Sequence, residues 1–261
     1  MIRRDHPGLL ALALFGLLII SYFGLKIVSK EMSNANEFKT KKLEVTGLDN
    51  LLSKAIKELS PEQNAELEIL NHLLVDSKTE TSKAEILKKI SGFWYKIDKM
   101  HLAGAYANQV AEIEKTEEAW SIAGTTFLSG MEANFEEKDR LYCKQQARVA
   151  FENAISLAPE NPQHRLNLAL CAVKMPDENP MQGILALLDL EKTYPDYVPL
   201  QLVLSQLAIQ TGQWEKAYKR LTGLLAKQKE LPEANCLMEQ VILQGGIQDD
   251  PAKYSKYCKK N

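Results

Sequence analysis

One spacing of small and large apolar residues recurs along the chain and restricts the fold more than any other feature. A small residue is followed four positions later by an apolar residue, and three positions after that by another. Spacings of three and four place such side chains on one face of an α-helix. The pattern repeats after 36 residues and then after 34. The aligned positions are Ala147, Phe151 and Ala154; Gly183, Leu187 and Leu190; and Ala217, Leu221 and Leu224.

The chain after Lys42 has the pattern of helices throughout. Apolar residues are spaced by three and four, with no sustained alternation and no Asn-Gly or Asp-Gly turn, so strands are not predicted. No proline occurs between Pro61 and Pro159. The segments Ser60–Gln63 and Ser82–Glu85 have the form of capping boxes at helix starts. The sequence therefore predicts an all-α fold.

These units resemble tetratricopeptide (TPR) repeats, which are helix–turn–helix units of 34 residues. The segment between the two helices of the first clear unit is longer than in the family, and we expect Met131–Asp139 to absorb the extra residues. The resemblance implies an α-solenoid of stacked repeats, because a single helix pair cannot bury its apolar face. Gly183 and Ala217 should then lie at close helix crossings. The family's motif positions are Trp120, Ala123, Gly124 and Phe127 in the first helix, and Ala147, Phe151, Ala154 and Pro159 in the second.

The resemblance divides the chain into segments. Residues 84–244 form the TPR domain, with about four repeats, one of them degenerate, and a capping helix. Residues 43–83 are expected to form a further, non-consensus helix pair. Residues 245–261 form a C-terminal tail, whose stretch Lys253–Lys260 we expect to be solvated and frayed.

The N-terminal segment differs from the rest. Gly8–Leu25 holds 18 residues without a charge. As a helix it would extend roughly 27 Å, close to the thickness of a bilayer's hydrocarbon core. No small-residue cleavage site follows, which favours a membrane anchor over residues 1–28 rather than a signal peptide. Residues 29–42 then form a polar linker. The predicted fold is thus an N-terminal transmembrane helix followed by a TPR α-solenoid.

The charges beside this segment leave its orientation open. Arg3 and Arg4 precede it, and Lys26, Lys30 and Lys39 follow it. The short arginine-bearing tail resists translocation, which favours a single-pass membrane protein with an extracytoplasmic domain. Cysteines without a pairing pattern favour a reducing compartment instead.

No group of residues has the spacing of a catalytic or metal site. The chain lacks phosphate-binding glycine motifs and a G-x-S-x-G sequence. The histidines lie far apart, and no C-x-x-C motif occurs. A formal net charge of −2 gives no support for nucleic-acid binding. We therefore expect no enzyme activity, no cofactor, no metal and no nucleic-acid partner. The residues considered are His6, His72, His101 and His164, and Cys143, Cys171, Cys236 and Cys258.

In the TPR family the first helices of successive repeats line a groove that binds an extended or helical peptide. At the corresponding positions this chain is apolar to neutral, which favours a mixed hydrophobic peptide or an amphipathic helix over a terminal carboxylate. Alternatively, the leucines among them pack neighbouring repeats. The groove candidates are Glu118, Ser121, Thr125 and Leu128; Gln163, Leu166, Asn167, Leu170 and Val173; and Leu202, Gln206 and Ile209.

The leading hypothesis is a non-catalytic, membrane-tethered TPR scaffold that binds a protein partner or assembles a membrane complex. The chain resembles bacterial proteins with an anchor and TPR repeats that assist the secretion translocon or cytochrome c maturation. The alternatives are a cytosol-facing import or assembly receptor and a regulatory subunit of an enzyme. The sequence identifies neither the partner nor the oligomeric state.

Overall fold

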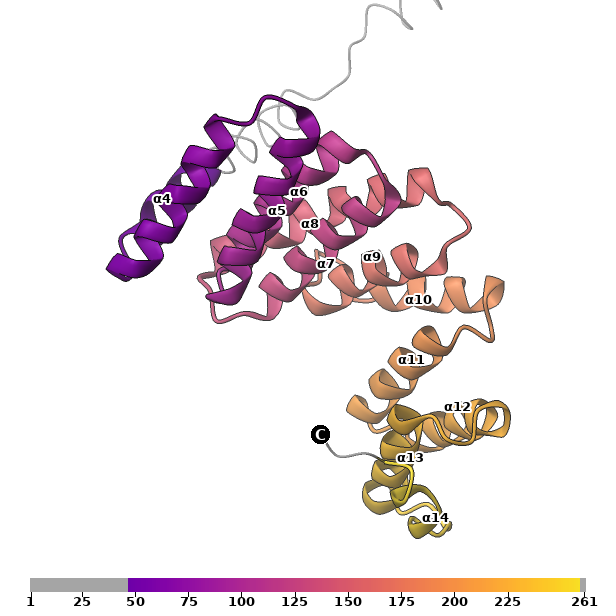
Figure 1. Ribbon diagram of the computed structural model, residues 1–261. Coiled ribbons are helices and arrows are strands. Elements are labelled where there is room, and N and C mark those ends of the chain that lie inside the picture. Colours follow the sequence, from indigo (N-terminus) through magenta and orange to yellow (C-terminus); the bar gives the residue numbers. More distant parts are fainter. Residues whose placement is uncertain (1–46, 259–261) are drawn as a thin grey trace, which may run out of the picture. The chain divides into compact units, whose positions relative to one another are not determined.

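The structure is a computed structural model that describes residues 47–258, and the regular elements of that part are α-helices (Figure 1). The elements are α3 (Leu48–Ile56), α4 (Pro61–Val75), α5 (Glu80–Lys96), α6 (Met100–Glu114), α7 (Glu117–Glu132), α8 (Glu137–Leu157), α9 (Pro162–Lys174), α10 (Gln182–Thr193), α11 (Val198–Gln210), α12 (Trp214–Lys227), α13 (Pro232–Gly245) and α14 (Ala252–Ser255). From α4 onward successive helices pack on one another in chain order, whereas α3 packs on α6.

The recurring spacing marks the buried face of the second helix in each repeat. The repeats are the pairs α7–α8, α9–α10 and α11–α12, preceded by α5–α6 and followed by α13. All nine aligned positions on α8, α10 and α12 are buried. The prediction of an all-helical, TPR-like repeat fold is therefore confirmed.

Close helix crossings depend on positions without a side chain. A Cβ atom on Gly124 of α7 would lie 2.5 Å from the ring of Phe151 on α8. A Cβ atom on Gly183 of α10 would lie 2.6 Å from the backbone nitrogen of Val173 on α9. Glycine at these positions lets neighbouring helices approach closely enough to bury the large apolar residues beside them. The prediction of a close crossing at Gly183 is confirmed.

Helix starts follow the sequence signals with one shift. Ser60 caps α4: its hydroxyl accepts a hydrogen bond from the backbone N–H of Gln63 at 3.2 Å, and the Gln63 side chain accepts one from the Ser60 N–H at 2.9 Å. The capping box predicted at Ser82 is wrong by three residues, because Thr79 is the cap of α5 and Ser82 is its third helical residue.

The extra residues of the first clear repeat lengthen a helix. The loop between α7 and α8 is short, and α8 has 21 residues against 12 in α10. Tyr142, on the extended part of α8, packs against the core formed by α3 to α6. The added residues therefore join the first repeat to the helices that precede it.

The structure corrects the prediction of a membrane-spanning helix. Within residues 47–258 no helix is both long and apolar enough to cross a membrane. The longest one there, α8, carries charged residues along its length, because one face packs on neighbours and the other meets solvent. The predicted span Gly8–Leu25, the anchor 1–28 and the linker 29–42 lie outside the described residues. We therefore withdraw the transmembrane part of the fold and the single-pass membrane localisation.

The expectation of a frayed C-terminal tail is wrong for the part of the tail that the structure describes, which ends at residue 258. Cys258 forms a disulfide with Cys236 of α13. The Asp249 carboxylate accepts hydrogen bonds from the hydroxyls of Tyr218 at 3.0 Å and Tyr254 at 2.9 Å. Tyr254 also packs against the core of α11 to α13. The tail thus covers the last repeat.

We expect Gly183→Ala to lower the free energy of unfolding by about 1–3 kcal/mol. The new methyl group would press on backbone atoms of Ala172 and Val173, which cannot move aside as a side chain can. Urea denaturation measures the effect. Equal or greater stability in the variant would show that α10 does not lie against α9 as described.

We expect Cys258→Ser to destabilise the protein by about 2–3 kcal/mol, because the cross-link closes a loop with a sequence separation of 22 residues. Thermal unfolding with and without a reductant measures this loss. A reductant should lower the melting temperature of the wild type but not that of the variant. A wild type indifferent to reduction would argue against the disulfide.

Candidate functional site

A groove lies between the first helices of two successive repeats, α5 and α7. Each of these helices packs closely on α6, but they do not pack closely on one another. The space between them is an open pocket of about 440 Å³ with α6 at its base. We call it the α5–α7 groove. It is lined by Lys88, Ser91, Gly92 and Tyr95 of α5, by Ala107, Val110 and Glu114 of α6, by Thr116, and by Glu118, Ala119, Ile122 and Thr126 of α7.

The groove combines an apolar centre with a polar rim. Two large hydrophobic side chains are exposed in the groove: Tyr95 is 53% exposed and Ile122 is 52% exposed. At the rim, Lys88 and Glu114 form an ion pair with a 2.6 Å N–O distance. Exposed apolar side chains that gather in a concave surface are typical of binding sites rather than of ordinary solvent-facing surface.

Gly92 lines the groove and has open space at its Cβ position. A Cβ atom there would meet no atom within 4 Å, in contrast to the crowded positions of Gly124 and Gly183. Glycine inside a helix costs roughly 0.5–1 kcal/mol relative to alanine. Packing against other helices therefore does not explain Gly92.

The predicted groove residues of α7 and α9 lie in different surroundings. Glu118 lines the α5–α7 groove, and Thr125 is exposed further along α7. Ser121 and Leu128 are half-buried, and Leu128 packs against the core around Phe127 and Phe151. On α9, Leu166 is buried, and Leu170 and Val173 are half-buried against the same core between α9, α10 and α11.

Gln163 and Asn167 of α9 are held by hydrogen bonds within the protein. The Gln163 amide donates to the Asn167 side chain at 2.8 Å, and the Tyr197 hydroxyl donates to Gln163 at 2.5 Å. Asn167 is buried, so its side chain faces the interior.

On α11, Ile209 is buried, Leu202 packs against the last repeat, and Gln206 is exposed. The structure therefore places only Glu118 of the twelve candidates in the α5–α7 groove. Leu166 and Leu170 pack in the core between α9, α10 and α11, and Leu202 packs in the core of α11 to α13.

Sequence reasoning missed the residues that make this groove. Leu87, Ile90 and Trp94 are the core positions of α5, and Tyr95 lies off that stripe. Large apolar residues outside the core register, close to an unexplained helical glycine, are the signal that could have found the site.

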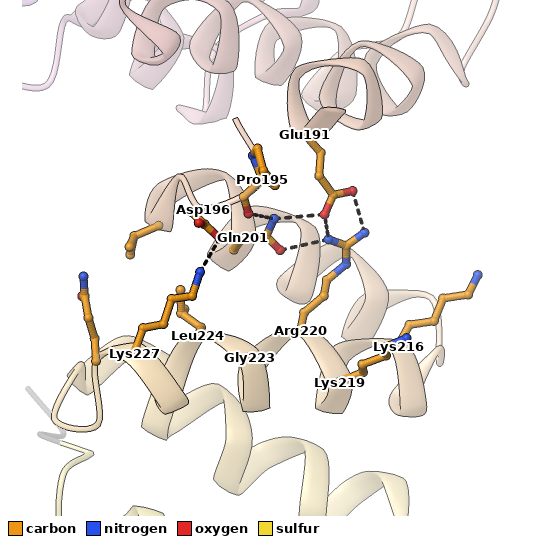
Figure 2. Close-up of a pocket in the computed structure, with 12 residues that line it drawn as sticks. Glu191, Pro195, Asp196, Gln201, Lys216, Lys219, Arg220, Gly223, Leu224 and Lys227 are labelled. Carbon is orange, nitrogen blue, oxygen red and sulfur yellow. Dashed lines mark hydrogen bonds and ion pairs between the residues drawn. The ribbon is translucent and has the colours of Figure 1, made fainter. Parts of the chain in front are cut away.

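A second pocket, of about 470 Å³, opens between α12 and the segment that joins α10 to α11 (Figure 2). We call it the α12 pocket. At one end the Arg220 guanidinium binds the Glu191 carboxylate with both of its terminal nitrogens, and it also donates to the Gln201 side chain at 2.9 Å. The hydrogen bond from Arg220 lowers the pKa of Glu191, because it favours the charged carboxylate. This network ties α10, α11 and α12 together.

Two buried polar groups lie near the junction of α3, α6 and α8. His101 packs edge-on to Phe135, with ring centroids 4.5 Å apart, and its Nδ1 has no hydrogen-bond partner among the described residues. One oxygen of Asp139, at the start of α8, is likewise buried and unpartnered there. Burial raises the pKa of Asp139. Across residues 47–258, no cluster of three or more histidine, cysteine or acidic residues could hold a metal ion.

Comparison with known proteins does not assign the chain to a family. No protein-family model matches the chain, and no curated protein matches it significantly. Among solved structures, the crystal structure of the MamA protein is similar, with 14% sequence identity and a TM-score of 0.43. The matched region covers 67% of this chain and 89% of that chain. A similarity of this size says nothing about what the protein binds.

We expect stability to fall as the pH is lowered from about 6.5 to 4, and His101 to cause part of that fall. Burial lowers the pKa of His101 from 6.5 to about 4, and the charge of Lys99 adds to the shift. In that window the unfolded histidine binds a proton and the folded one does not, so protonation favours unfolding by at most about 1.4 kcal/mol per pH unit.

Urea denaturation at several pH values measures the slope, and His101→Leu should reduce it. His72 is exposed, so His72→Leu serves as the matched control and should keep the slope of the wild type. An unchanged slope in His101→Leu would contradict a neutral, buried His101.

Proposed function

We propose that the protein is a non-catalytic interaction scaffold of the TPR type, and that the α5–α7 groove binds a short segment of a partner protein. The observation that carries this proposal is the open groove between two first helices, with open space at the Cβ position of Gly92. Related grooves in the TPR family bind peptides, which makes this the functional surface to test first.

The lining of the groove defines the kind of segment that fits. Tyr95 and Ile122 offer apolar contact on opposite sides, and the space over Gly92 can take one bulky apolar side chain. Glu118 and the Lys88–Glu114 pair supply charges of both signs at the rim. An amphipathic segment with one large apolar anchor and flanking polar residues matches this arrangement.

Site-specific photo-crosslinking in the native cells tests the proposal. A benzoylphenylalanine residue is introduced at Tyr95 or at Ile122, and in a control at Leu243, which is 64% exposed on α13. We expect the two groove positions to share crosslinked proteins that are absent from the control position.

Gly92 variants separate binding from folding. Gly92→Phe should fill the groove and remove those crosslinked products while the fold is kept, since a Cβ atom at this position would meet no atom within 4 Å. Gly92→Ala should raise stability by up to about 1 kcal/mol. Identical products from all three crosslinker positions, or products that persist in Gly92→Phe, would contradict binding in the groove.

A further inference from the structure

The α12 pocket presents a row of cations on one face of a helix. Lys216, Lys219, Arg220 and Lys227 are separated by three, one and seven residues, which places them along one side of α12 (Figure 2). Glu191 and Asp196 are the acidic residues of the lining. Four positive and two negative groups leave the lining with a net charge of 4 − 2 = +2, in a chain whose formal net charge is −2.

The cations fall into two groups. Arg220 is neutralised by Glu191, and Lys227 is paired with Asp196 at 2.5 Å. Lys216 donates only to the neutral side chain of Gln213 at 2.6 Å. Lys219 makes no hydrogen bond or ion pair with any residue that the structure describes. Two positive charges at one end of the pocket therefore lack an acidic partner there.

The pocket also has apolar residues in its lining and open space at a glycine. Gly223 lies within α12, and a Cβ atom there would meet no atom within 4 Å. Val198, Pro195 and Leu224 line the pocket beside it. Among the helical glycines of the described chain, only Gly92 and Gly223 have open space at the Cβ position, and each lines a pocket. Gly223 carries the same helix-destabilising cost as Gly92, and packing does not explain it.

We propose that the α12 pocket is a second docking site, which takes an acidic peptide segment of a partner protein. A carboxylate of the segment binds at Lys216 and Lys219, and an apolar side chain enters the space over Gly223. Glu191 and Asp196 occupy Arg220 and Lys227, which leaves only Lys216 and Lys219 without an acidic partner. Two cations suit one or two carboxylates better than the dense row of phosphates on a nucleic acid or an anionic membrane. The site shares no residue with the α5–α7 groove and lies on a second helix of a repeat, so the two can be occupied independently.

Fluorescence anisotropy tests this with the purified chain. The probe is a short fluorescein-labelled peptide in which glutamate and leucine alternate, and its matched control carries glutamine in place of glutamate. We expect saturable binding of the acidic peptide that weakens as the salt concentration rises, and at least tenfold weaker binding of the control. No binding of the acidic peptide, or equal binding of both peptides, would overturn the proposal.

Variants test whether the acidic peptide binds at α12. The double variant K216E/K219E should weaken binding at least tenfold, whereas Lys192→Glu, on the exposed face of α10, should leave it within twofold. Gly223→Leu should fill the pocket and also weaken binding, with helicity unchanged by circular dichroism. Equal loss in Lys192→Glu and in the double variant, or stronger binding to anionic lipid vesicles or single-stranded RNA than to the peptide, would refute a peptide site.

The variant Gly92→Phe distinguishes this proposal from the proposed function. It should leave binding of the acidic peptide unchanged, because Gly92 lies in the α5–α7 groove. Loss of peptide binding in that variant would assign the peptide to the groove and refute the α12 site.

Discussion

The close approach of neighbouring helices at positions without a side chain is the contact on which the rest of the fold depends. Phe151 lies over Gly124, and Phe127 lies over Gly104, so that rings of successive helices fill the space left by glycines of the preceding ones. Both rings are fully buried. Because each helix pair is amphipathic, this stacking is what removes its apolar face from water. A larger residue at these glycines would separate the helices and expose the core of two repeats at once.

The two pockets lie between helices that are two apart in the chain and do not pack closely on one another. Between α5 and α7 the first helices separate, and between α10 and α12 the second helices do so. At the latter place polar contacts take over: Glu191, Gln201 and Arg220 hold three helices together without filling the space. The concave surface therefore lies between alternate helices, while successive helices keep the repeat arrangement.

Much of the fold could be predicted from the sequence, because burial imposes a period on the residues. The positions equivalent to Ala147, Phe151 and Ala154 repeat since each faces the same kind of neighbour, and the structure buries them all. The disulfide between Cys236 and Cys258 had no such signal, because a pairing depends on where the tail returns and not on a motif. The residues that line the groove were harder to predict than the disulfide. The apolar spacing predicts which residues of a helix face inward. The distance between helices then decides whether an inward residue such as Leu166 contacts a ligand or a neighbouring helix.

The two kinds of glycine offer a physical criterion for separating binding surface from packing. At Gly124 and Gly183 the absence of a side chain is required by atoms that lie where the Cβ would be. At Gly92 and Gly223 nothing requires it, and alanine would make the helix more stable. A glycine that lowers helix stability at a pocket without a packing reason is therefore a marker of candidate binding surface. The same reasoning applies on α5 and on α12, and it underlies the proposal that the chain is a scaffold with two separate sites for partner segments.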